Sequence, residues 1–575
     1  MFVLGISCYF HDAAAALLKD GVLLAAAEEE RFTRRKHDYS FPQNAIDYCL
    51  RVAGIEGRDV DYVVFYEKPF VKLERILLTS LQSFPRSLGL FREAMLTWLL
   101  DKLWVKGLIK DRTSVNSNEQ ILFSWHHLSH AASAFFCSPF EEAAILTVDA
   151  VGEWTTTLQG RGEGSQIHVS RELHFPHSLG LLYSAFTAFC GLEVNEGEYK
   201  LMGMAPYGEP KYVDKIYKLV DVGRDGSFSL DMDYFAFHRS SSQMFSSKFV
   251  KLFGEPKDPK RSDIIDPYYA DMAASIQEVT EEILLKMANH LHQETGLSKL
   301  CMAGGVALNS VANGRILRET PFEEIYIQPA SGDGGGALGA ALYAYHMLLN
   351  KPRSFVMEHA YWGQEYDPSE IRTVLDAQGA SYVELSNDDE VIEKTVDLLQ
   401  NHKVVGWFQG GFEYGPRALG NRSILADPRQ EDMKDLVNRK IKFREPFRPF
   451  APSVVAERTE EFFALPNALR HYPARFMLLV VDVKNDKRDA VPAITHVDGT
   501  ARPQAVFKKT NERYYRLIQE FGEATGVPVV LNTSFNLKGE PIVNTPADAL
   551  STFMRSGMDA LVLDRFLVTK SGEEE

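Results

Sequence analysis

The stretch "FVLGISCYFHDAAAALLKDGVLLAAAEEERF" (residues 2–32) predicts three antiparallel strands at the start of the chain. The apolar run "FVLGIS" (2–7) is the first strand, and "AAAALLKDG" (13–21) is the second. The second run ends in Asp-Gly, which is a hairpin signal, so "VLLAAAEEERF" (22–32) becomes the third strand. A chain that begins with three paired strands must cover the resulting sheet with later elements.

The same order of elements returns after residue 142. Three further strands are predicted over 143–175 from "AAILTVDAVGE", "WTTTLQGRGEG" and "SQIHVSRELHF". Helices and strands then alternate in both parts, over 43–67 and over 269–329. Two such units predict a duplicated α/β domain with a cleft between its halves, which is the pattern of actin-like and sugar-kinase-like ATPases. The alternative is that a large α/β protein shows this echo by chance.

A change in composition marks the end of this part. Residues 351–368 are rich in Pro, Gly and polar residues and have no clear periodicity, which predicts a linker. Helices and strands alternate again from "SEIRTVLDAQG" (369–379) to "VPVVLNTSF" (527–535). We therefore expect an N-terminal domain over 1–350 and a second α/β domain over 369–575.

Length, charge and cysteine content limit the classes of function. The chain has 575 residues, 45% of them hydrophobic and 24% charged, so it is long enough for two or more folded domains. Its net charge of -16 argues against general affinity for nucleic acid or anionic membranes and favours small-molecule partners. The 5 cysteines lack CxxC spacing, and no signal peptide or membrane span is recognised, so we expect a cytoplasmic protein. Monomer and homodimer both remain open.

Three histidines lie close together in "LFSWHHLSHAASAFF" (122–136). If a helix begins there, His126 and His130 are four positions apart and share one face, where two imidazoles can bind a divalent metal. The equally weighted alternative is a pair of half-buried histidines bonded to backbone carbonyls. His127 points elsewhere and is expected to be a packing residue.

Two carboxylates could complete such a metal site. Asp149 follows the buried run "AAILTV", and ligands in open α/β sheets bind at the carboxyl ends of strands. Asp333 lies in "SGDGGGALGAAL", where Gly334 and Gly335 allow backbone amides to approach an anion at a helix N-terminus.

A second glycine turn, "MAGGVALNS" (302–310), also connects a strand to a helix. Its Gly304 and Gly305 allow close approach of a ligand, and Asn309 can hydrogen-bond an adenine or a ribose. The alternative for both turns is tight helix packing. Taken together, the turns, the aspartates and the histidine pair predict a cleft that binds a nucleotide and a metal.

The second domain carries its own concentration of cations. The cations between residues 417 and 448 include Arg417, Arg422, Arg429, Lys442, Arg444 and Arg448. Such a cluster is costly without a counter-anion, so it predicts an anion site, whereas the alternative is a solvated face paired with Asp and Glu. Asn532 and Ser534 follow a buried strand and are placed to contact a ribose or a phosphate.

Several motifs resemble a known family in the same order from end to end. They are "FHDAAAAL" (10–17), "HHLSHAASAFF" (126–136), "SGDGGGALGAA" (331–341), "YGPRALGNRSILADPR" (414–429) and "LNTSFNLKGEPIV" (531–543). The chain thereby resembles the O-carbamoyltransferases of nodulation-factor and antibiotic biosynthesis. The resemblance implies an actin-like (ASKHA) N-terminal domain, similar to tRNA threonylcarbamoyl transferases, and a YrdC-like C-terminal domain.

The resemblance also implies an activity. The C-terminal domain would make carbamoyladenylate from carbamoyl phosphate and ATP, with Mg²⁺ accompanying ATP, and the N-terminal domain would transfer the carbamoyl group to a hydroxyl of a small-molecule acceptor. The implied ligands of a divalent metal, with iron(II) expected, are His126, His130, Asp149 and Asp333. The residues that match the adenylate-forming site are Arg417, Lys442, Arg448, Arg502, Asn532 and Ser534.

Two residues resemble groups near the transferred carbamoyl, His11 and Lys36. Without the resemblance, His11 would be interpreted as a core histidine at a strand end. Ala150 and Val151 depart from the family, because related sequences often carry glycine there. An actin-like sugar kinase and a nucleotide-binding regulatory protein are the rival functions.

Overall fold

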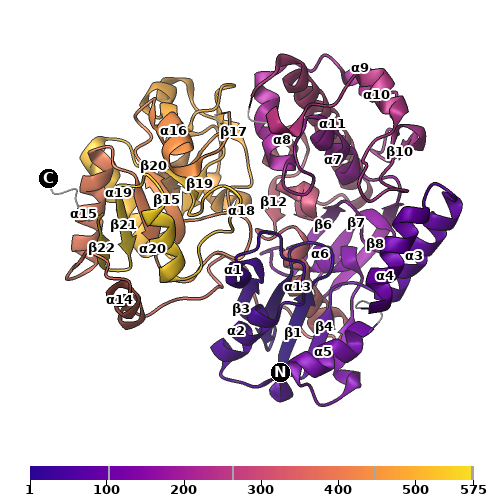
Figure 1. Cartoon of the computed structure of the whole chain (residues 1–575), viewed down its shortest axis with the longest axis horizontal. Coiled ribbons are helices and arrows are strands. Elements are labelled where there is room, and N and C mark those ends of the chain that lie inside the picture. The colour runs from indigo at the N-terminus through magenta and orange to yellow at the C-terminus, as the bar shows by residue number, and fades with distance from the viewer. Residues whose placement is uncertain (101–103, 262–263, 446, 571–575) are drawn as a thin grey trace. The chain divides into compact units, whose positions relative to one another are not determined.

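The computed structural model describes residues 1–100, 104–261, 264–445 and 447–570. The chain folds as two compact units, each coloured by residue number in Figure 1. The N-terminal unit contains residues 1–29 and 39–356, and the C-terminal unit contains residues 30–38 and 357–575. The short segment 30–38 therefore packs with the C-terminal unit, although it comes early in the chain. Residues 571–575 of the predicted second domain lie outside the described residues.

The first sheet of the N-terminal unit is built by the opening stretch. In spatial order its strands are β3 (Val22–Glu28), β2 (Ala14–Lys19), β1 (Phe2–Ser7), β4 (Tyr62–Phe65) and β5 (Ile121–Phe123). β1, β2 and β3 pair antiparallel, whereas β4 and β5 continue the sheet in parallel from β1. The predicted third strand is wrong beyond Glu28, because the short helix α1 (Glu30–Thr33) of the C-terminal unit begins there.

The second sheet repeats this topology. In spatial order its strands are β8 (Gln166–His174), β7 (Thr155–Glu163), β6 (Glu142–Val148), β11 (Lys299–Ala303) and β12 (Glu324–Ile327). Again three antiparallel strands come first, and two parallel strands are added beside the first of them. The predicted duplication is confirmed, and the unit has the α/β actin-like architecture.

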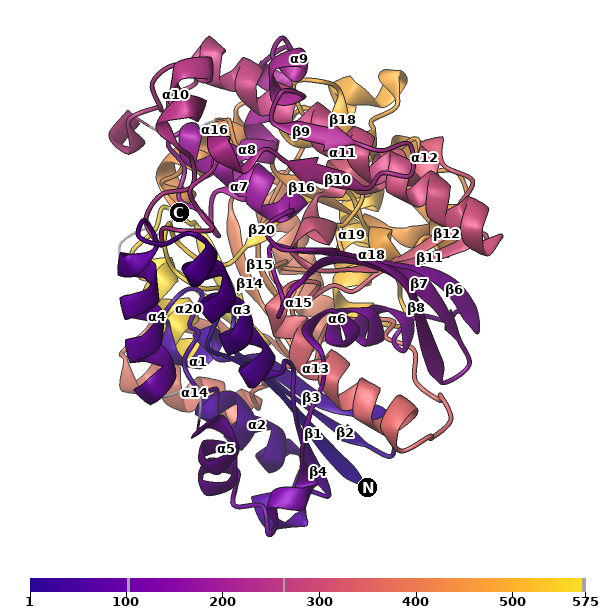
Figure 2. The same ribbon diagram turned by 90° about the vertical axis from the view of Figure 1, so that its right-hand side faces the viewer.

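Two equivalent helices lie between the sheets. α6 (His126–Phe135) follows the last strand of the first repeat, and α13 (Asp333–Tyr343) follows the last strand of the second. Figure 2 shows them side by side. Gly339 permits their close approach, since a Cβ there would lie 1.8 Å from the backbone oxygen of Ser129. Gly5 of β1 does the same for α13, with a Cβ position 1.8 Å from the oxygen of Ala337.

The long helix α11 shows how local sequence sets element ends. It runs over Pro267–Thr295. The side chain of Asp266 accepts a hydrogen bond from the backbone of Tyr268 at its start, and Gly296 ends it in the left-handed conformation.

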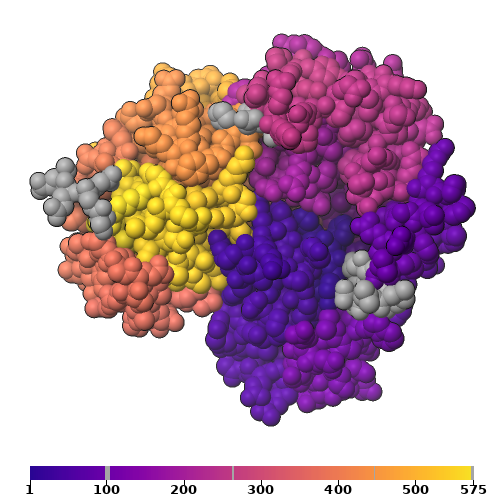
Figure 3. Space-filling view, viewed as in Figure 1, coloured from indigo at the N-terminus to yellow at the C-terminus, as the bar shows by residue number. Residues whose placement is uncertain are grey.

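The remaining helices cover the two sheets or extend from them. They are α2 (Gln43–Ala53), α3 (Pro69–Gln82), α4 (Leu88–Leu100), α5 (Val105–Thr113), α7 (Leu179–Phe189), α8 (Glu198–Met204), α9 (Val213–Ile216), α10 (Ser247–Phe253) and α12 (Ser310–Glu319). A hairpin of β9 (Val220–Val222) and β10 (Phe228–Leu230) completes the unit. Helices α3 and α4 lie at its surface in the space-filling view (Figure 3).

The C-terminal unit is a mixed α/β domain around an 8-stranded sheet. Its strands, in spatial order, are β13 (Tyr382–Glu384), β22 (Phe566–Val568), β21 (Ala560–Leu563), β14 (Val405–Phe408), β15 (Arg422–Ala426), β20 (Val529–Ser534), β16 (Ala451–Val455) and β19 (Gln504–Val506). Helices α15 (Asp388–Gln400) and α19 (Glu512–Thr525) pack on this sheet around Trp407 and Phe521, which are fully buried.

Shorter elements complete the C-terminal unit. They are α14 (Pro368–Ala377), α16 (Met433–Leu436), α17 (Thr459–Phe462), α18 (Tyr472–Arg475), α20 (Pro546–Met554), β17 (Val481–Asp482) and β18 (Thr500–Ala501). Segment 30–38 is held to this unit by Arg31, which donates to the oxygen of Gly415, and by Arg34, which donates to the oxygens of Pro541 and Ile542.

Across both units, the helices that the structure describes include none with the combined length and apolar character needed for crossing a bilayer.

The contact between α6 and α13 predicts the effect of one added methyl group. Gly339→Ala should destabilise the fold by about 1–3 kcal/mol, because the new Cβ overlaps the Ser129 oxygen. Gly107→Ala is the matched control, since no atom lies within 4 Å of its Cβ position and alanine favours a helix. Thermal unfolding of both variants is the measurement. A Gly339→Ala protein as stable as the control would contradict the packing argument.

Candidate functional site

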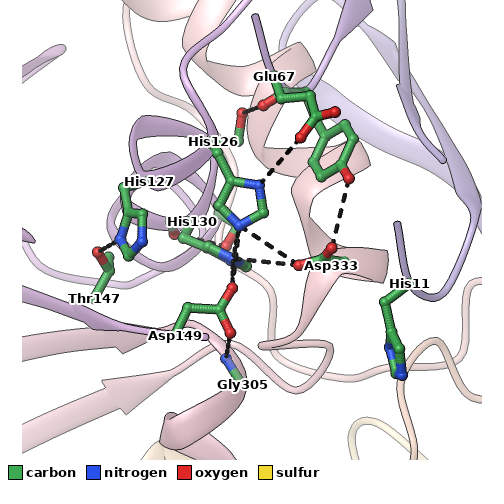
Figure 4. Close-up of polar contacts among 12 residues, drawn as sticks. His11, Glu67, His126, His127, His130, Thr147, Asp149, Gly305 and Asp333 are labelled. Carbon is green, nitrogen blue, oxygen red and sulfur yellow. Dashed lines mark hydrogen bonds and ion pairs between the residues drawn. The ribbon is translucent and has the colours of Figure 1, made fainter. Parts of the chain in front are cut away.

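Four predicted metal ligands converge in the N-terminal unit. His126 and His130 lie in the first turns of α6, on the shared face that their spacing predicts (Figure 4). Asp149 follows the end of β6, and Asp333 is the first residue of α13. All four side chains are buried, and their donor atoms lie within 4.8 Å of one another.

The distances suit a single ion at the centre. The two Nε2 atoms of His126 and His130 are 3.1 Å apart, and Asp149 Oδ2 lies 3.1 and 3.2 Å from them. Asp333 Oδ1 lies 3.6 and 3.7 Å from the same nitrogens. Ligands bound at about 2.1 Å are separated by roughly 3.0–3.4 Å, so the observed spacing nearly matches a coordination shell. The histidines contact carboxylates and each other at these atoms, not backbone carbonyls as in the alternative interpretation.

The charges of this cluster also favour a cation. Burial alone would lower the pKa of His126, but Asp333 and Asp149 outweigh it and raise the pKa to about 9. Burial alone would raise the pKa of Asp149, but hydrogen bonds from His126 and His130 hold it well below its ordinary value. Burial and the charge of Asp149 raise the pKa of Asp333, against the lowering by His126 and His130. Buried carboxylates of this kind are stabilised by a bound metal ion.

Each aspartate has its outer oxygen held by the fold. Asp149 Oδ1 accepts a hydrogen bond of 3.0 Å from the backbone N–H of Gly305, and Tyr66 donates its hydroxyl to Asp333 Oδ2 at 3.5 Å. The inner oxygens are thereby directed at the histidines. His127 is placed apart, with its Nδ1 2.7 Å from the hydroxyl of Thr147, and burial lowers its pKa well below the ordinary value.

In the two glycine turns, over 302–310 and 331–342, neighbouring backbone atoms lie close to some of the glycines. Gly304 has a φ of +94°, and a Cβ there would lie 2.3 Å from the oxygen of Val148. At Gly335 a Cβ would lie 1.9 Å from the oxygen of Ala330, while at Gly334 the nearest atom would be 3.5 Å away. Close backbone approach therefore requires glycine at two of these positions.

Two other residues predicted to contact nucleotide have partners within the unit. The N–H of Gly305 is occupied by Asp149. Asn309 caps α12 by accepting from Ala312 N–H at 3.1 Å, and it exchanges hydrogen bonds with the buried Gln277.

His11 lies after β1 and is only partly buried, with 22% of its side chain exposed. Its Nδ1 is 2.7 Å from Asp12 Oδ2. Burial alone would lower the pKa of His11, but Asp12, with help from Asp333 and Asp149, raises it to about 9. His11 is therefore a cation at neutral pH, and two of the carboxylates that raise its pKa belong to the group of His126, His130, Asp149 and Asp333. We call this group the histidine–aspartate cluster.

The C-terminal unit gathers most of the predicted cations around Lys442. The Lys442 ammonium is buried and donates to backbone and side-chain oxygens of Ser534 and Asn536, all at 2.6–3.2 Å. Its pKa lies well below the ordinary value because of burial and the neighbouring cations Arg444, Arg448 and Lys36. Lys36 thus lies beside Lys442 in the C-terminal unit, whereas His11 belongs to the other unit.

Arg502 extends this cation cluster. Burial and the neighbouring guanidinium groups of Arg417, Arg444 and Arg448 hold its pKa well below the ordinary value. Adjacent guanidinium groups repel one another, so the arrangement is favourable once an anion such as a phosphate lies among them. We call the set Lys36, Arg417, Lys442, Arg444, Arg448 and Arg502 the cation cluster.

Arg422 and Arg429, which belong to the motif over 414–429, lie outside the cation cluster. Arg422 is fully buried and donates to the backbone oxygens of Gln409 and Gly410, so its role is structural. Arg429 pairs with Asp427 at 2.7 Å, as the alternative interpretation of a salt-bridged face predicts.

Two polar residues of β20 have different surroundings. Asn532 is buried and donates to Ser453 and Gln504, whereas Ser534 contacts Lys442 directly. From the sequence alone, Asn536 is not identified as a partner of Lys442, although its position in "NTSFN", two residues after Ser534, could have indicated it.

Two models of known protein families match the chain. The family model described as "Carbamoyltransferase N-terminus" matches residues 2–342, and that described as "Carbamoyltransferase C-terminus" matches residues 396–570.

Relatives extend over nearly the whole chain. It is 49% identical to the uncharacterized protein sll1178 of Synechocystis sp., over 100% of this chain and 97% of that protein. It is 38% identical to nodulation protein NolNO of Sinorhizobium fredii, over 98% of this chain and 79% of that protein. It is 28% identical to nodulation protein U of Rhizobium tropici, over 92% and 90% of the two chains. The chain therefore belongs to the carbamoyltransferase family and is a transferase enzyme.

Proposed function

We propose that the enzyme is an ATP-dependent O-carbamoyltransferase that works through carbamoyladenylate. The observation that carries the proposal is the cation cluster, in which six Lys and Arg side chains lie together in one unit of a chain with a net charge of -16. ATP and carbamoyl phosphate are anions that such a cluster would bind. Family membership supports a carbamoyl donor, and the acceptor is proposed to be a hydroxylated natural product or sugar.

The first half-reaction is assigned to the C-terminal unit. Carbamoyl phosphate loses phosphate with the consumption of one water, and the resulting carbamate oxygen attacks the α-phosphorus of ATP. Pyrophosphate leaves, and carbamoyladenylate remains. Lys442 and the arginines would stabilise the charge that develops on the phosphate oxygens, which is the largest contribution that fixed cations make to such a step. Mg²⁺ would accompany ATP.

The second half-reaction is assigned to the N-terminal unit. An acceptor hydroxyl forms a bond to the carbamoyl carbon, AMP leaves, and the hydroxyl proton moves to a base. His11 is the proposed base, since its imidazole lies beside the carboxylate cluster and can accept a proton once it is neutral.

The metal site is proposed to hold a divalent ion, with iron(II) expected, through His126, His130, Asp149 and Asp333. Buried imidazole and carboxylate donors at these distances fit such an ion. When bound, it would supply Lewis-acid polarisation of the carbamoyl carbonyl or anchorage of the adenylate phosphate.

Replacement of Lys442 tests the first half-reaction. Lys442→Ala should lower pyrophosphate release that depends on carbamoyl phosphate by about 10²–10³-fold, because a fixed charge at the phosphates is lost. Arg439→Ala is the matched control, since this cation of the same segment is 78% exposed. Formation of carbamoyladenylate at the normal rate by Lys442→Ala would refute the assignment. Phosphate transferred to a sugar, without pyrophosphate, would favour a kinase.

Single histidine replacements test the metal site. His126→Ala and His130→Ala should lose bound metal, whereas His127→Ala should retain it, because His127 Nδ1 contacts Thr147 and not the carboxylates. Elemental analysis of the purified proteins, with circular dichroism as the folding control, is the measurement. Full metal content in the first two variants, or loss in the His127 variant alone, would exclude these ligands.

The pH dependence of transfer tests His11. Since the pKa of His11 is raised to about 9, its neutral fraction grows with pH, and transfer should accelerate up to about pH 9 and then level off. Asp12→Asn removes the nearest carboxylate and should move the plateau to lower pH.

His11→Asn should stop transfer and leave carbamoyladenylate formation unchanged. The two half-reactions are measured as carbamoylated acceptor and as released pyrophosphate. Loss of both together would indicate that His11 is structural.

A further inference from the structure

The outer nitrogen of His126 faces a carboxylate that the proposed mechanism does not use. Nε2 of this imidazole points to Asp149 and Asp333, whereas the buried Nδ1 has no hydrogen-bond partner among the described residues. The nearest charged group to Nδ1 is the carboxylate of Glu67, with Oε2 at 3.9 Å, drawn as a dashed line in Figure 4.

Glu67 is itself held in place. It follows β4, its side chain is 2% exposed, and its Oε2 accepts a hydrogen bond of 2.6 Å from Lys72 Nζ. Lys72 belongs to α3 and its side chain is 3% exposed, so both charges are removed from water. Lys72 Nζ also lies 4.4 Å from the ring centre of Phe10. The carboxylate therefore has a defined position.

A second acid and a second cation complete this buried group. Glu153 accepts hydrogen bonds from the backbone N–H groups of His126 and Lys68. Arg75, three residues after Lys72 on α3, is buried over the ring of Phe175, and burial lowers its pKa to about 10 although Glu67 and Glu153 raise it. The negative charges of Glu67 and Glu153 are thus matched by the positive charges of Lys72 and Arg75 beside His126.

Buried ion pairs are costly, and apolar residues of similar volume often serve stability as well or better. Stability alone therefore gives no reason for four buried charges behind a metal ligand. A hydrogen bond to the outer atom of a ligand can fix the direction of its inner atom. In Asp149 and Asp333 the outer oxygen is held by Gly305 and by Tyr66 respectively, while the inner oxygen faces the centre of the cluster. For His126 the group in the corresponding outer position is Glu67.

We propose that Glu67, fixed by Lys72, is the positioning residue for His126 and accepts a hydrogen bond from its Nδ1–H. This inference rests on the metal site of the proposed function. The separation of 3.9 Å is too long for a hydrogen bond, and a rotation that shortens it by about 1 Å forms one. Such a carboxylate fixes the ring orientation of a histidine ligand and increases its basicity, so Nε2 stays directed at the ion.

The test is the affinity of the full-length, metal-stripped protein for Zn²⁺, measured by competition with a chelator, together with the absorption spectrum of the Co²⁺ form. Glu67→Gln should weaken Zn²⁺ binding by about 10–100-fold and alter the Co²⁺ spectrum. Glu281→Gln is the matched control, since Glu281 is a buried glutamate of the same unit that pairs with Arg315 at 2.8 Å and contacts no metal ligand. The control should bind Zn²⁺ like the wild type.

A double variant separates positioning from folding. Glu67→Leu with Lys72→Met removes both charges, leaves no unpaired ion in the interior and should weaken Zn²⁺ binding at least as much as Glu67→Gln. Wild-type affinity and an unchanged Co²⁺ spectrum in both Glu67 variants would overturn the inference and leave the metal site intact. Equal weakening by Glu281→Gln would also overturn it, as a general effect of buried charge. A wild-type protein without Zn²⁺ affinity would overturn the proposed metal site as well.

Discussion

The close approach of α6 and α13 is the constraint on which the N-terminal unit depends. The two helices occupy equivalent places in the two repeats, and they can touch because position 339 carries no side chain. Their contact puts the two histidines of one repeat beside Asp333 of the other. A duplicated fold thus creates, at the junction of its halves, a site that neither half contains alone.

The candidate sites of the two units have opposite electrostatic character. In the N-terminal unit, buried carboxylates surround two imidazoles, an arrangement that a cation would stabilise. In the C-terminal unit, Lys442 and Arg502 lie among other cations and have depressed pKa values, an arrangement that an anion would stabilise. Both sites hold like charges close together in the folded protein, and a bound ion of the opposite charge would offset their repulsion. Perturbed groups of this kind are typical of functional sites.

Hydrogen bonds with neighbouring groups hold Asp149, Asp333 and His126 of the histidine–aspartate cluster in place. A backbone N–H holds Asp149, a buried tyrosine hydroxyl holds Asp333, and a backbone N–H of His126 is held by Glu153. These contacts come from segments far apart in the chain, and they leave the inner atoms directed at one point. Preorganisation of this kind lowers the cost of ordering ligands when an ion binds, because their rotamers are already fixed.

The sequence by itself determined the repeat of three antiparallel strands, the helix that carries His126 and His130, and the concentration of cations after residue 417. These features depend on local periodicity, on turn residues and on spacing within one element, all of which are present in short windows. Only the tertiary structure decided which cations share a site, because Arg429 meets Asp427 whereas Lys442 meets other cations. It also placed segment 30–38 in the C-terminal unit and Glu67 behind His126. Such pairings join residues that are distant in sequence, and the balance of burial and charge that selects them exists only once the chain has folded.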